Sequence, residues 1–484
     1  MAKWDVTVVG SGPNGLAAAV TMARAGLSVR VVERMDAIGG GARTAELTLP
    51  GFRHDVCSAV HPMALASPFF RAFGLAERIE LAVPEISYAH PLDGGRAGLA
   101  WHDIARTEEA LGVDGRAWRQ LFDALVHDID NVAEIAGSSM LQIPRHPITM
   151  AKLGMRVLEQ GSPVWNVRFR DAIAPAMIAG VGAHAIGRMP RLGTSSVGMV
   201  LAAHAHARGW PIPIGGSQAI ADALADDLRV HGGTIETGVE ITDLGEIADS
   251  RAVLLDVSVR GLLGIAGDRL PDRYIAALRR YRYGNGVAKV DFALSEPVPW
   301  THPELHKAGT LHLGGTRAEI ARAEGEVAKG RHSANPYVLI SQPGAHDSSR
   351  APSGKTVLWA YTHVPHGSNI DQTEAIIRQI ERFAPGFRET ILATASKTAT
   401  ALDAYNPNYV GGDISSGAMT MFQLVKRPVL APNPWRTPIA GVYLCSSATP
   451  PGPSVHGLCG WYAAESALRD VFGIRELPSL APGA

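Results

Sequence analysis

Residues 5–34 read DVTVVGSGPNGLAAAVTMARAGLSVRVVER, and this stretch decides the fold. An apolar run leads directly into Gly10-x-Gly12-x-x-Gly15, a helical segment follows, and a second apolar run ends at Glu33. A strand, a glycine-rich turn, a helix and a second strand form the context in which this motif binds a dinucleotide. The sequence therefore predicts a βαβ unit with a diphosphate at the N-terminus of its helix.

The glycines and the acidic residue of this unit have separate roles. Gly10 allows the strand to turn tightly, Gly12 lets the backbone approach a pyrophosphate, and Gly15 lets the helix and strand pack closely. Glu33 can accept hydrogen bonds from both hydroxyls of an adenosine ribose. Its negative charge would repel a 2′-phosphate, which disfavours NADP in this site.

A second glycine-rich stretch follows the second strand. Residues 37–47 read AIGGGARTAEL, where an NAD dehydrogenase would continue with another α/β repeat. Gly39, Gly40 and Gly41, followed by Arg43, indicate a second close approach of the backbone to a long cofactor. An FAD has this requirement, because its flavin extends beyond the diphosphate. We therefore expect FAD as the cofactor.

The bulk composition describes a large globular protein. The chain has 484 residues, which is more than one simple core usually holds, so two domains are expected. Hydrophobic residues make up 46% and charged residues 19%, as in a well-buried enzyme. The formal net charge of −1 gives no sign of a basic stripe, so we expect no nucleic-acid partner.

Cysteine usage indicates a reducing compartment. Cys57, Cys445 and Cys459 show neither CxxC nor metal-ligand spacing, so no metal site is expected. The first strand begins near residue 5, and we therefore expect no signal peptide and a cytoplasmic location.

Membrane contact is expected to be peripheral at most. The most apolar stretch, residues 172–187, is interrupted by Pro175 and His184, so it predicts a buried helix or the wall of a lipophilic tunnel. In residues 138–170, apolar side chains alternate with Arg and Lys, which suggests peripheral contact with a membrane. The alternative is an ordinary surface of a cap domain.

Two further regions complete the expected architecture, a helical insertion and a substrate domain. Apolar residues at helical spacing predict a mostly helical insertion over 105–135 and 150–185. A helix after Ser217 and a strand over 234–241 predict a return to the cofactor domain. The remaining expected elements are strands at 284–300, 310–315, 356–364 and 442–445, and helices at 371–385 and 458–472.

These elements predict an α/β protein, α+β overall. A Rossmann-type FAD-binding domain is expected from the discontinuous segments 1–78, 205–260 and 405–473. A mixed sheet-and-helix substrate or cap domain is expected from 79–204 and 261–404. Residues 474–484 are expected to be a flexible tail.

The chain resembles the phytoene-dehydrogenase-related FAD-dependent oxidoreductases, within the amine-oxidase-like class of flavoproteins. The resemblance extends over essentially the whole chain. Besides the N-terminal motif and the strand with Val239, it rests on YNPNYVGGDISSGAM at 405–419 and on TPIAGVYLCSSATPPG, which begins at Thr437 and is followed by Val455, His456 and Gly457.

The resemblance implies an FAD held in extended form. The residues implied in cofactor binding are Gly10, Ser11, Gly12, Asn14, Gly15, Glu33, Arg34, Gly40, Gly41, Arg43, Val239, Ser447, Val455, His456 and Gly457. Val239 matches a strand residue that contacts the adenine through its backbone, and the terminal loop 447–457 would lie beside the flavin.

Catalytic residues are harder to identify, because the flavin itself supplies the chemistry. His456 is the first candidate as a hydrogen-bond donor or proton carrier beside the flavin. Arg43 could balance the charge of a reduced flavin, and Tyr409 could line the substrate cavity. His61 could lie at the cavity mouth, whereas His363 is expected to be structural.

The leading hypothesis is an FAD-dependent dehydrogenase, desaturase or oxidase that takes a hydride from a hydrophobic substrate. Oxygen or a quinone would then accept the electrons. The alternatives are a flavin amine oxidase, with an aromatic cage around a cationic nitrogen near Trp461 and Tyr462, and double-bond isomerisation without net redox change. A flavin-free lipid-binding or escort protein on the same fold is the alternative outside the enzymes.

Overall fold

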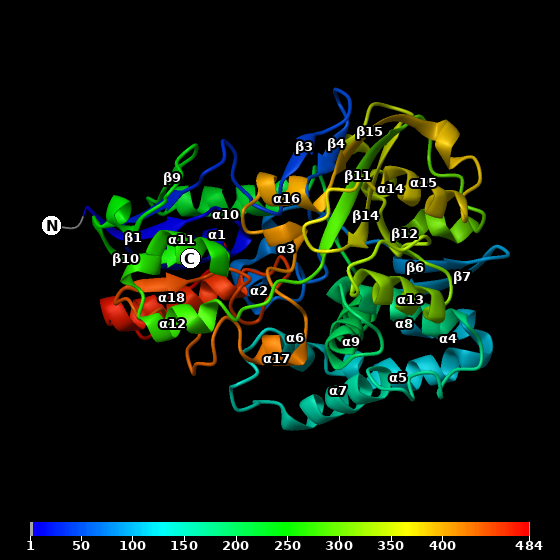
Figure 1. Cartoon of the computed structure of the whole chain (residues 1–484), viewed down its shortest axis with the longest axis horizontal. Helices are drawn as coiled ribbons and strands as arrows, with labels where there is room; N and C mark the ends of the chain where they lie inside the picture. Colours follow the sequence, from blue (N-terminus) through cyan, green and yellow to red (C-terminus); the bar gives the residue numbers. More distant parts are fainter. Residues whose placement is uncertain (1–2, 484) are drawn as a thin grey trace.

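The first layer of the molecule is a parallel sheet at one end of the structure. The computed structural model describes residues 3–483, and Figure 1 places this sheet on the side of the chain termini. Its strand order is β16-β10-β1-β2-β9, with every neighbouring pair parallel. The strands are β1 (Trp4–Val9), β2 (Val29–Val32), β9 (Thr234–Glu236), β10 (Ser250–Leu255) and β16 (Val442–Leu444).

Helices cover both faces of this sheet, as a parallel sheet requires. On one face, α1 (Pro13–Arg24) packs between α10 (Gln218–Val230) and α18 (Leu458–Phe472) over the side chains of Val6 and Val8. On the other face, α11 (Val259–Ala266) and α12 (Asp272–Leu278) cover the alternate strand residues. The alternation of strand side chains between two apolar layers buries the central strand β1 almost completely.

The second layer is a seven-stranded mixed sheet in the other half of the molecule (Figure 1). Its order is β15-β11-β14-β13-β12-β6-β7, and every pair is antiparallel except β12 with β6. One face is apolar and packs on α15 (Thr373–Glu381). The strands are β6 (Ile86–Leu92), β7 (Arg96–Trp101), β11 (Gly286–Leu294), β12 (Ala308–Leu313), β13 (Val338–Ser341), β14 (Thr356–Val364) and β15 (Ile391–Lys397).

A helical cap closes the opposite face of the second sheet, at the bottom of Figure 1. Its core consists of apolar side chains from several of these helices together with Tyr88 and Trp210. The cap helices are α4 (Ile104–Ala110), α5 (Gly115–His127), α6 (Ile129–Ala136), α7 (Pro147–Gln160), α8 (Ile173–Gly182) and α9 (Leu192–Ala207).

Shorter elements connect these parts. They are the hairpins β3 (Thr44–Glu46) with β4 (Arg53–Asp55) and β5 (Leu81–Ala82) with β8 (Ile212–Pro213), and the helices α2 (Pro68–Phe73), α3 (Leu75–Arg78), α13 (Arg317–Val327), α14 (Pro343–His346), α16 (Ala399–Tyr405) and α17 (Met421–Val425). Eight short 3₁₀ segments complete the regular structure of residues 3–483.

The structure confirms the α/β fold class and corrects several details. The strand expected over 234–241 ends at Glu236, because Gly238 adopts a left-handed φ of 71° that interrupts extended backbone. The helix expected over 150–185 is divided into α7 and α8, with residues 161–172 between them. The five strands of the parallel sheet all come from the segments expected to build the cofactor domain.

The segment expected to be a flexible tail is largely exposed over its described part, residues 474–483, but it is anchored near Leu480. Leu480 is 4% exposed and belongs to the core beneath α1. Arg24 Nη1 donates to the carbonyl oxygens of Ser479 and Ala481 at 3.1 and 3.0 Å. Within residues 3–483, no helix combines the length and apolarity needed to cross a bilayer.

Candidate active site

A cavity of about 1360 Å³ extends from the glycine-rich turn after β1 to the second sheet and the cap. Its volume exceeds the roughly 300–1,000 Å³ of a typical single-ligand pocket. The wall combines the carboxyl ends of parallel strands with residues of the mixed sheet, such as Ser341 and Trp359. The carboxyl edge of a parallel sheet is where such folds bind ligands. The cavity therefore has room for a dinucleotide and for a second molecule.

The glycines at the start of α1 make a cradle of bare backbone. Gly10 has a left-handed φ of 98°, and the N-cap residue Gly12 has no side chain of its own to cap the helix. A Cβ on Gly15 would lie 2.2 Å from the carbonyl oxygen of Gly10, so only glycine fits there. A Cβ on Gly40 would lie 3.0 Å from the Cα of Gly12. The two glycine-rich stretches therefore pass each other at the helix N-terminus, which is a favourable place for phosphate.

Glu33 ends β2 beside this cradle. Its carboxylate accepts hydrogen bonds from Ser11 N at 2.9 Å, Ser11 Oγ at 2.6 Å and Met35 N at 2.8 Å. Glu33 also lines the cavity. The side chain is thus fixed at the strand end, with one lone pair of Oε1 left to accept from a ribose hydroxyl.

The terminal loop closes the opposite side of the cradle. Asn14 Nδ2 donates to Ser447 Oγ at 3.3 Å, which joins α1 to the loop before α18. The other amide atom, Asn14 Oδ1, is buried without a hydrogen-bond partner. Such an unpaired polar atom at the cavity wall indicates a missing ligand or water donor. Gly457, with a left-handed φ of 70°, starts α18 behind this wall.

Comparison with known proteins agrees with this geometry. A model of the NAD(P)-binding Rossmann-like domain matches residues 8–73. The chain is 26% identical to pyridine nucleotide-disulfide oxidoreductase domain-containing protein 2 of Rattus norvegicus, over 97% of this chain and 94% of that protein. It is 27% identical to phytoene dehydrogenase of Streptomyces griseus, over 80% of this chain and 77% of that protein.

Over most of its length, the chain is similar to proteins of the FAD-dependent oxidoreductase family.

Solved structures share the fold. Wild-type putrescine oxidase bound to putrescine matches with a TM-score of 0.58 and 18% identity, covering 97% of this chain and 99% of that one. RAB GDI from Plasmodium falciparum matches with a TM-score of 0.53 and 11% identity, covering 98% and 99% of the two chains. At these identities the likeness concerns the fold alone.

The structure brings most of the cofactor residues expected in this family to one cavity. The residues in its wall are Gly10, Ser11, Gly12, Asn14, Glu33, Arg34, Gly40, Gly41, Arg43, Val239, Ser447, Val455 and His456. Gly15 and Gly457 lie behind the wall, where they allow close packing against Gly10 and Phe69. Val239 lies in the loop after β9, 38% exposed, where its N–H donates to the Glu33 carbonyl at 2.9 Å. The residues therefore fit an extended FAD. Bare backbone faces the diphosphate position, and Asn14 Oδ1 is a buried acceptor to which no protein group donates.

The catalytic role expected for His456 is not supported by its contacts. Its Nε2 faces the Gly452 carbonyl oxygen at 3.1 Å, and its Nδ1 accepts from Leu458 N at 3.0 Å. Burial lowers the pKa of His456 to about 4, so the ring stays neutral at physiological pH. Because both ring nitrogens are occupied by backbone, His456 stabilises the terminal loop and has no free atom for proton transfer.

Arg43 and Tyr409 both line the cavity. Arg43 Nη1 donates to the Tyr405 hydroxyl at 2.9 Å, and the guanidinium lies 5.6 Å from that ring. A Cβ on Gly41 would lie 2.4 Å from the Tyr409 hydroxyl, so the bare backbone of Gly41 makes room for the tyrosine. Burial raises the pKa of Tyr409 well above its usual value, which keeps the hydroxyl protonated.

His61 and His363 do not contribute to the cavity wall. His61, expected at the cavity mouth, is 2% exposed, and its Nε2 lies 2.8 Å from Ser217 Oγ. His363 pairs with buried Glu324 at 2.7 Å, as expected for a structural residue. Among the cysteines, Cys445 and Cys459 are fully buried, and Cys57 lines the cavity.

Asp256 is a site residue that the sequence analysis missed. It follows β10, lines the cavity and accepts from Gly15 N at 3.0 Å. A Cβ on Gly12 would lie 2.6 Å from its Oδ2. Burial raises the pKa of Asp256 to about 7, the Gly15 N–H opposes this, and the nearby charge of Glu33 adds to it. Its position could have been found from the strand Ser250–Leu255, since an acid directly after an apolar parallel strand lies at the ligand edge of the sheet.

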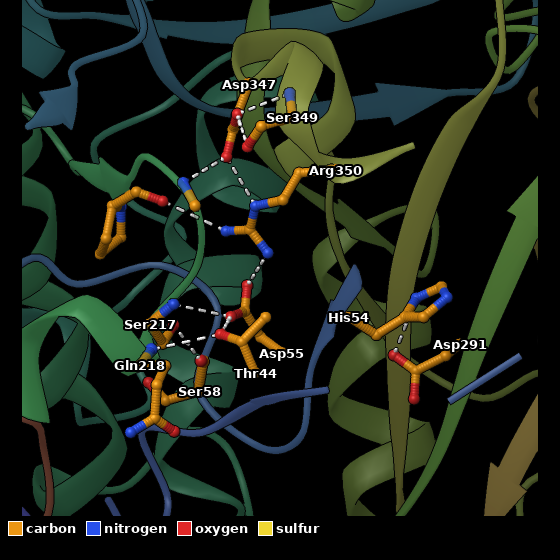
Figure 2. A network of polar contacts seen from close by, with 12 residues as sticks. Thr44, His54, Asp55, Ser58, Ser217, Gln218, Asp291, Asp347, Ser349 and Arg350 are labelled. Carbon is orange, nitrogen blue, oxygen red and sulfur yellow. Dashed lines mark hydrogen bonds and ion pairs between the residues drawn. The ribbon is translucent and has the colours of Figure 1, made fainter. Parts of the chain in front are cut away.

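A buried ion pair behind the aromatic wall was also missed. Lys289 Nζ donates to the Asp291 carboxylate. His54 Nδ1 lies 3.7 Å from Asp291 Oδ1 (Figure 2). Lys289 also lies 5.6 Å from the ring of Trp359, which faces the cavity. Burial lowers the pKa of Lys289. Two charged residues two positions apart in the apolar strand Gly286–Leu294 are the signal that could have revealed the pair.

A second buried network joins the two halves of the molecule beside this site (Figure 2). Arg350 is 0% exposed, and it donates to Asp55 Oδ2 at 3.0 Å and to Asp347 Oδ2 at 2.7 Å. Asp55 also accepts from Ser217 N, and Asp347 accepts from Gly215 N. These bonds tie the hairpin strand β4, the turn before α10 and the segment before β14 into one rigid contact. This contact fixes the part with the parallel sheet against the part with the mixed sheet.

Proposed function

We propose that the chain is an FAD-dependent oxidoreductase that oxidises a largely lipophilic small molecule. The observation that carries this proposal is the shared cavity: the glycine cradle and Glu33 open into the same space as the aromatic wall of Trp359 and Tyr361. A bound FAD supplies the hydride acceptor. Oxygen or a quinone is the proposed acceptor of the electrons.

The chain's own residues bind, orient and exclude water in this proposal. The N-terminus of α1 and the backbone of Gly12 and Gly40 would hold the diphosphate, and Glu33 the adenosine ribose. Arg43 lies at the cavity wall with a fixed charge beside Tyr405. The cap helices cover the sheet face and keep water from the reacting centre, which strengthens each polar contact inside.

An amine oxidase is the second candidate function. Trp359 and Tyr361 meet edge to face at 5.1 Å and 86° in the cavity wall, an arrangement that could receive a cationic nitrogen. The pair expected for this role, Trp461 and Tyr462, is stacked at 6.0 Å, with only Tyr462 at the cavity. Bleaching of the bound flavin by putrescine under anaerobic conditions would favour this candidate. A flavin-free escort protein is disfavoured by the intact cradle.

FAD binding tests the proposal directly, and Asp256 predicts how affinity depends on pH. Asp256 faces the cradle, with Glu33, Cys445 and Cys459 as the other titratable groups around it. A diphosphate disfavours the ionised carboxylate, so binding favours protonated Asp256. Because the pKa of Asp256 is about 7, the affinity for FAD should be highest and constant below pH 7. Above that pH it should fall by up to about tenfold per pH unit.

The measurement is quenching of FAD fluorescence by the purified apoprotein between about pH 6 and about pH 9. Asp256→Asn keeps an oxygen to accept from Gly15 N and removes the titration, so its affinity should not change with pH. An equal slope in wild type and variant would contradict the role of Asp256. No FAD binding and no flavin spectrum at any pH would refute the proposed function and favour the escort alternative.

We also propose that the chain contacts an anionic membrane surface through residues 138–170. Nine of the eighteen exposed large apolar side chains of the described residues lie between Met140 and Val167. The same segment contains five basic residues and one acidic residue. The loop before α7, including Met140 and Ile143, also lines the cavity, so a lipophilic substrate would enter from the lipid. An amphipathic surface of this composition suits a bilayer interface.

Vesicle sedimentation tests this surface. Wild type should bind vesicles of phosphatidylcholine with phosphatidylglycerol more strongly than phosphatidylcholine alone. Replacing Ile143, Ile148 and Val167 by serine should weaken binding about tenfold or more. A matched triple at Val230, Ile370 and Leu392, which are similarly exposed elsewhere, should bind like wild type. The membrane proposal would be overturned if the first triple variant bound the vesicles as strongly as wild type. It would also be overturned if that variant lost only the ability to self-associate in solution.

A further inference from the structure

The cavity-facing side of the seven-stranded sheet carries a continuous row of polar side chains. Strand pairing places Trp359 beside Ser341, Ser341 beside Thr310, and Thr310 beside Tyr88. The four residues come from the neighbouring strands β14, β13, β12 and β6. We call them the polar row, and three of them, Trp359, Ser341 and Thr310, line the cavity.

Every member of the polar row has a polar atom without a partner. Trp359 Nε1, Ser341 Oγ, Thr310 Oγ1 and Tyr88 OH are buried and make no hydrogen bond within the described residues. The four side chains are at most 6% exposed. Buried polar atoms are nearly always satisfied in proteins, and an isolated exception is costly. Four exceptions along one register line indicate that something else supplies the partners.

A histidine from the cap faces the same end of the cavity. His184 lines the cavity, and its Nε2 lies 2.9 Å from Nε2 of buried His312, which follows Thr310 by two positions on β12. Trp210 holds the His184 ring edge to face at 5.5 Å. Ile186, two residues later, has a left-handed φ of 49°. A β-branched residue in that conformation is strained, and such strain is retained where a local geometry is needed.

We propose that the polar row and His184 form a subsite for an uncharged oxygen-bearing group, a hydroxyl or a carbonyl, at the inner end of the substrate. The inference rests on the proposed function in taking this cavity as the substrate chamber. It specifies the substrate class: a lipophilic body with one neutral oxygen function. A pure hydrocarbon would offer no hydrogen-bond partner to the three members of the polar row that line the cavity.

The charges around the subsite exclude an ion. Burial lowers the pKa of His184 to about 3 and that of His312 far below its usual value, so both rings are neutral. Lys289 and Asp291 pair with each other behind Trp359, and Glu324 pairs with His363. None of the five residues of the subsite carries a formal charge, so a carboxylate or an ammonium would find no opposite charge among them. The hydroxyls of Ser341 and Thr310 can donate and accept hydrogen bonds, and the Trp359 indole can donate one. These groups match a neutral oxygen of the ligand.

Head-group binding tests the subsite without any turnover. The probes octan-2-one, octan-2-ol, octanoate, octylamine and octane share a chain and differ in their polar end. Binding is measured by thermal shift and calorimetry on the FAD-loaded protein and on the apoprotein. We expect octan-2-one and octan-2-ol to bind most tightly. The double variant Ser341→Ala/Thr310→Val should weaken both about tenfold and leave octane unchanged.

A stability readout separates this role from a structural one. Because Ser341 Oγ and Thr310 Oγ1 have no protein partner, the double variant should be as stable as wild type or more so. Ser87→Ala is the matched control: its hydroxyl donates to the Ala205 carbonyl at 2.9 Å, so it should lose stability and keep the probe ranking.

Tighter binding of octanoate, octylamine or octane than of the neutral oxygen probes would overturn the subsite. So would undiminished octan-2-one binding in the double variant, which would assign the row to ordered water. FAD affinity should be equal in wild type and double variant. If the wild-type protein does not bind FAD, the proposed function is refuted. The ranking of the probes on the apoprotein would still test the subsite independently.

Discussion

Replacing Gly460 by alanine should lower the melting temperature by several degrees and weaken FAD binding, whereas Gly325→Ala should do neither. Gly460 is where α18 crosses α1. A Cβ there would lie 1.8 Å from the Asn14 carbonyl oxygen and 3.0 Å from Ala18 N. Both are backbone atoms, so no side-chain rotation relieves the clash, and the two helices must separate. Overpacking of this kind costs about 1–3 kcal/mol, and a backbone clash belongs at the upper end.

The effect should reach the cofactor because Asn14 belongs to the cradle. Its Nδ2 bonds to Ser447, and displacement of α1 from α18 breaks that link. Gly325 on α13 is the matched control, since a Cβ there meets nothing within 4 Å and the residue lies outside the cavity wall. Alanine in an open helical position stabilises by about 0.5–1 kcal/mol. Thermal unfolding and FAD titration of both variants measure the difference. Equal melting temperatures would show that the helix contact adapts and would refute the argument.

Local signals explain which parts of the fold could be predicted. The helix expected over 458–472 and the strand expected over 356–364 have those boundaries in the structure, since each lies between strong turn residues. The cradle was predictable for the same reason: Gly10, Gly12 and Gly15 act on neighbours within a few residues. The strand through Val239 was overextended, because apolar alternation continued past Gly238 while the backbone did not.

The missed site residues depend on contacts that are distant in the sequence. Asp256 faces the cradle only because β10 pairs with β1. Thr310, Ser341 and Trp359 become neighbours only through the register of three strands. Their polar atoms look ordinary in the sequence, and only burial reveals that they lack partners. For His456, the place in a family motif suggested chemistry, and the structure adds that both ring nitrogens contact backbone groups.

Arg350→Met should lower the free energy of unfolding by about 3–5 kcal/mol, because it breaks a buried ion-pair network. The side chain is fully buried, and it donates to Asp55 and Asp347, which come from different halves of the molecule. Methionine fills a similar volume and leaves two buried carboxylates facing each other without a cation. Arg388→Met is the matched control: its pair with Glu374 is exposed to solvent, so the substitution should change the stability little.

Acid should reduce the difference between Arg350→Met and wild type. An unpaired buried carboxylate has a raised pKa in the folded state, so the folded variant binds more protons than the unfolded chain. Its stability therefore rises as the pH falls from about 7 toward about 4. Adding Asp55→Asn to Arg350→Met should recover part of the loss at neutral pH, since one buried charge is removed. Denaturant unfolding at several pH values measures the free energy of unfolding of wild type, the single variant and the double variant. A loss that is independent of pH, or no recovery in the double variant, would mean that packing rather than charge makes Arg350 necessary.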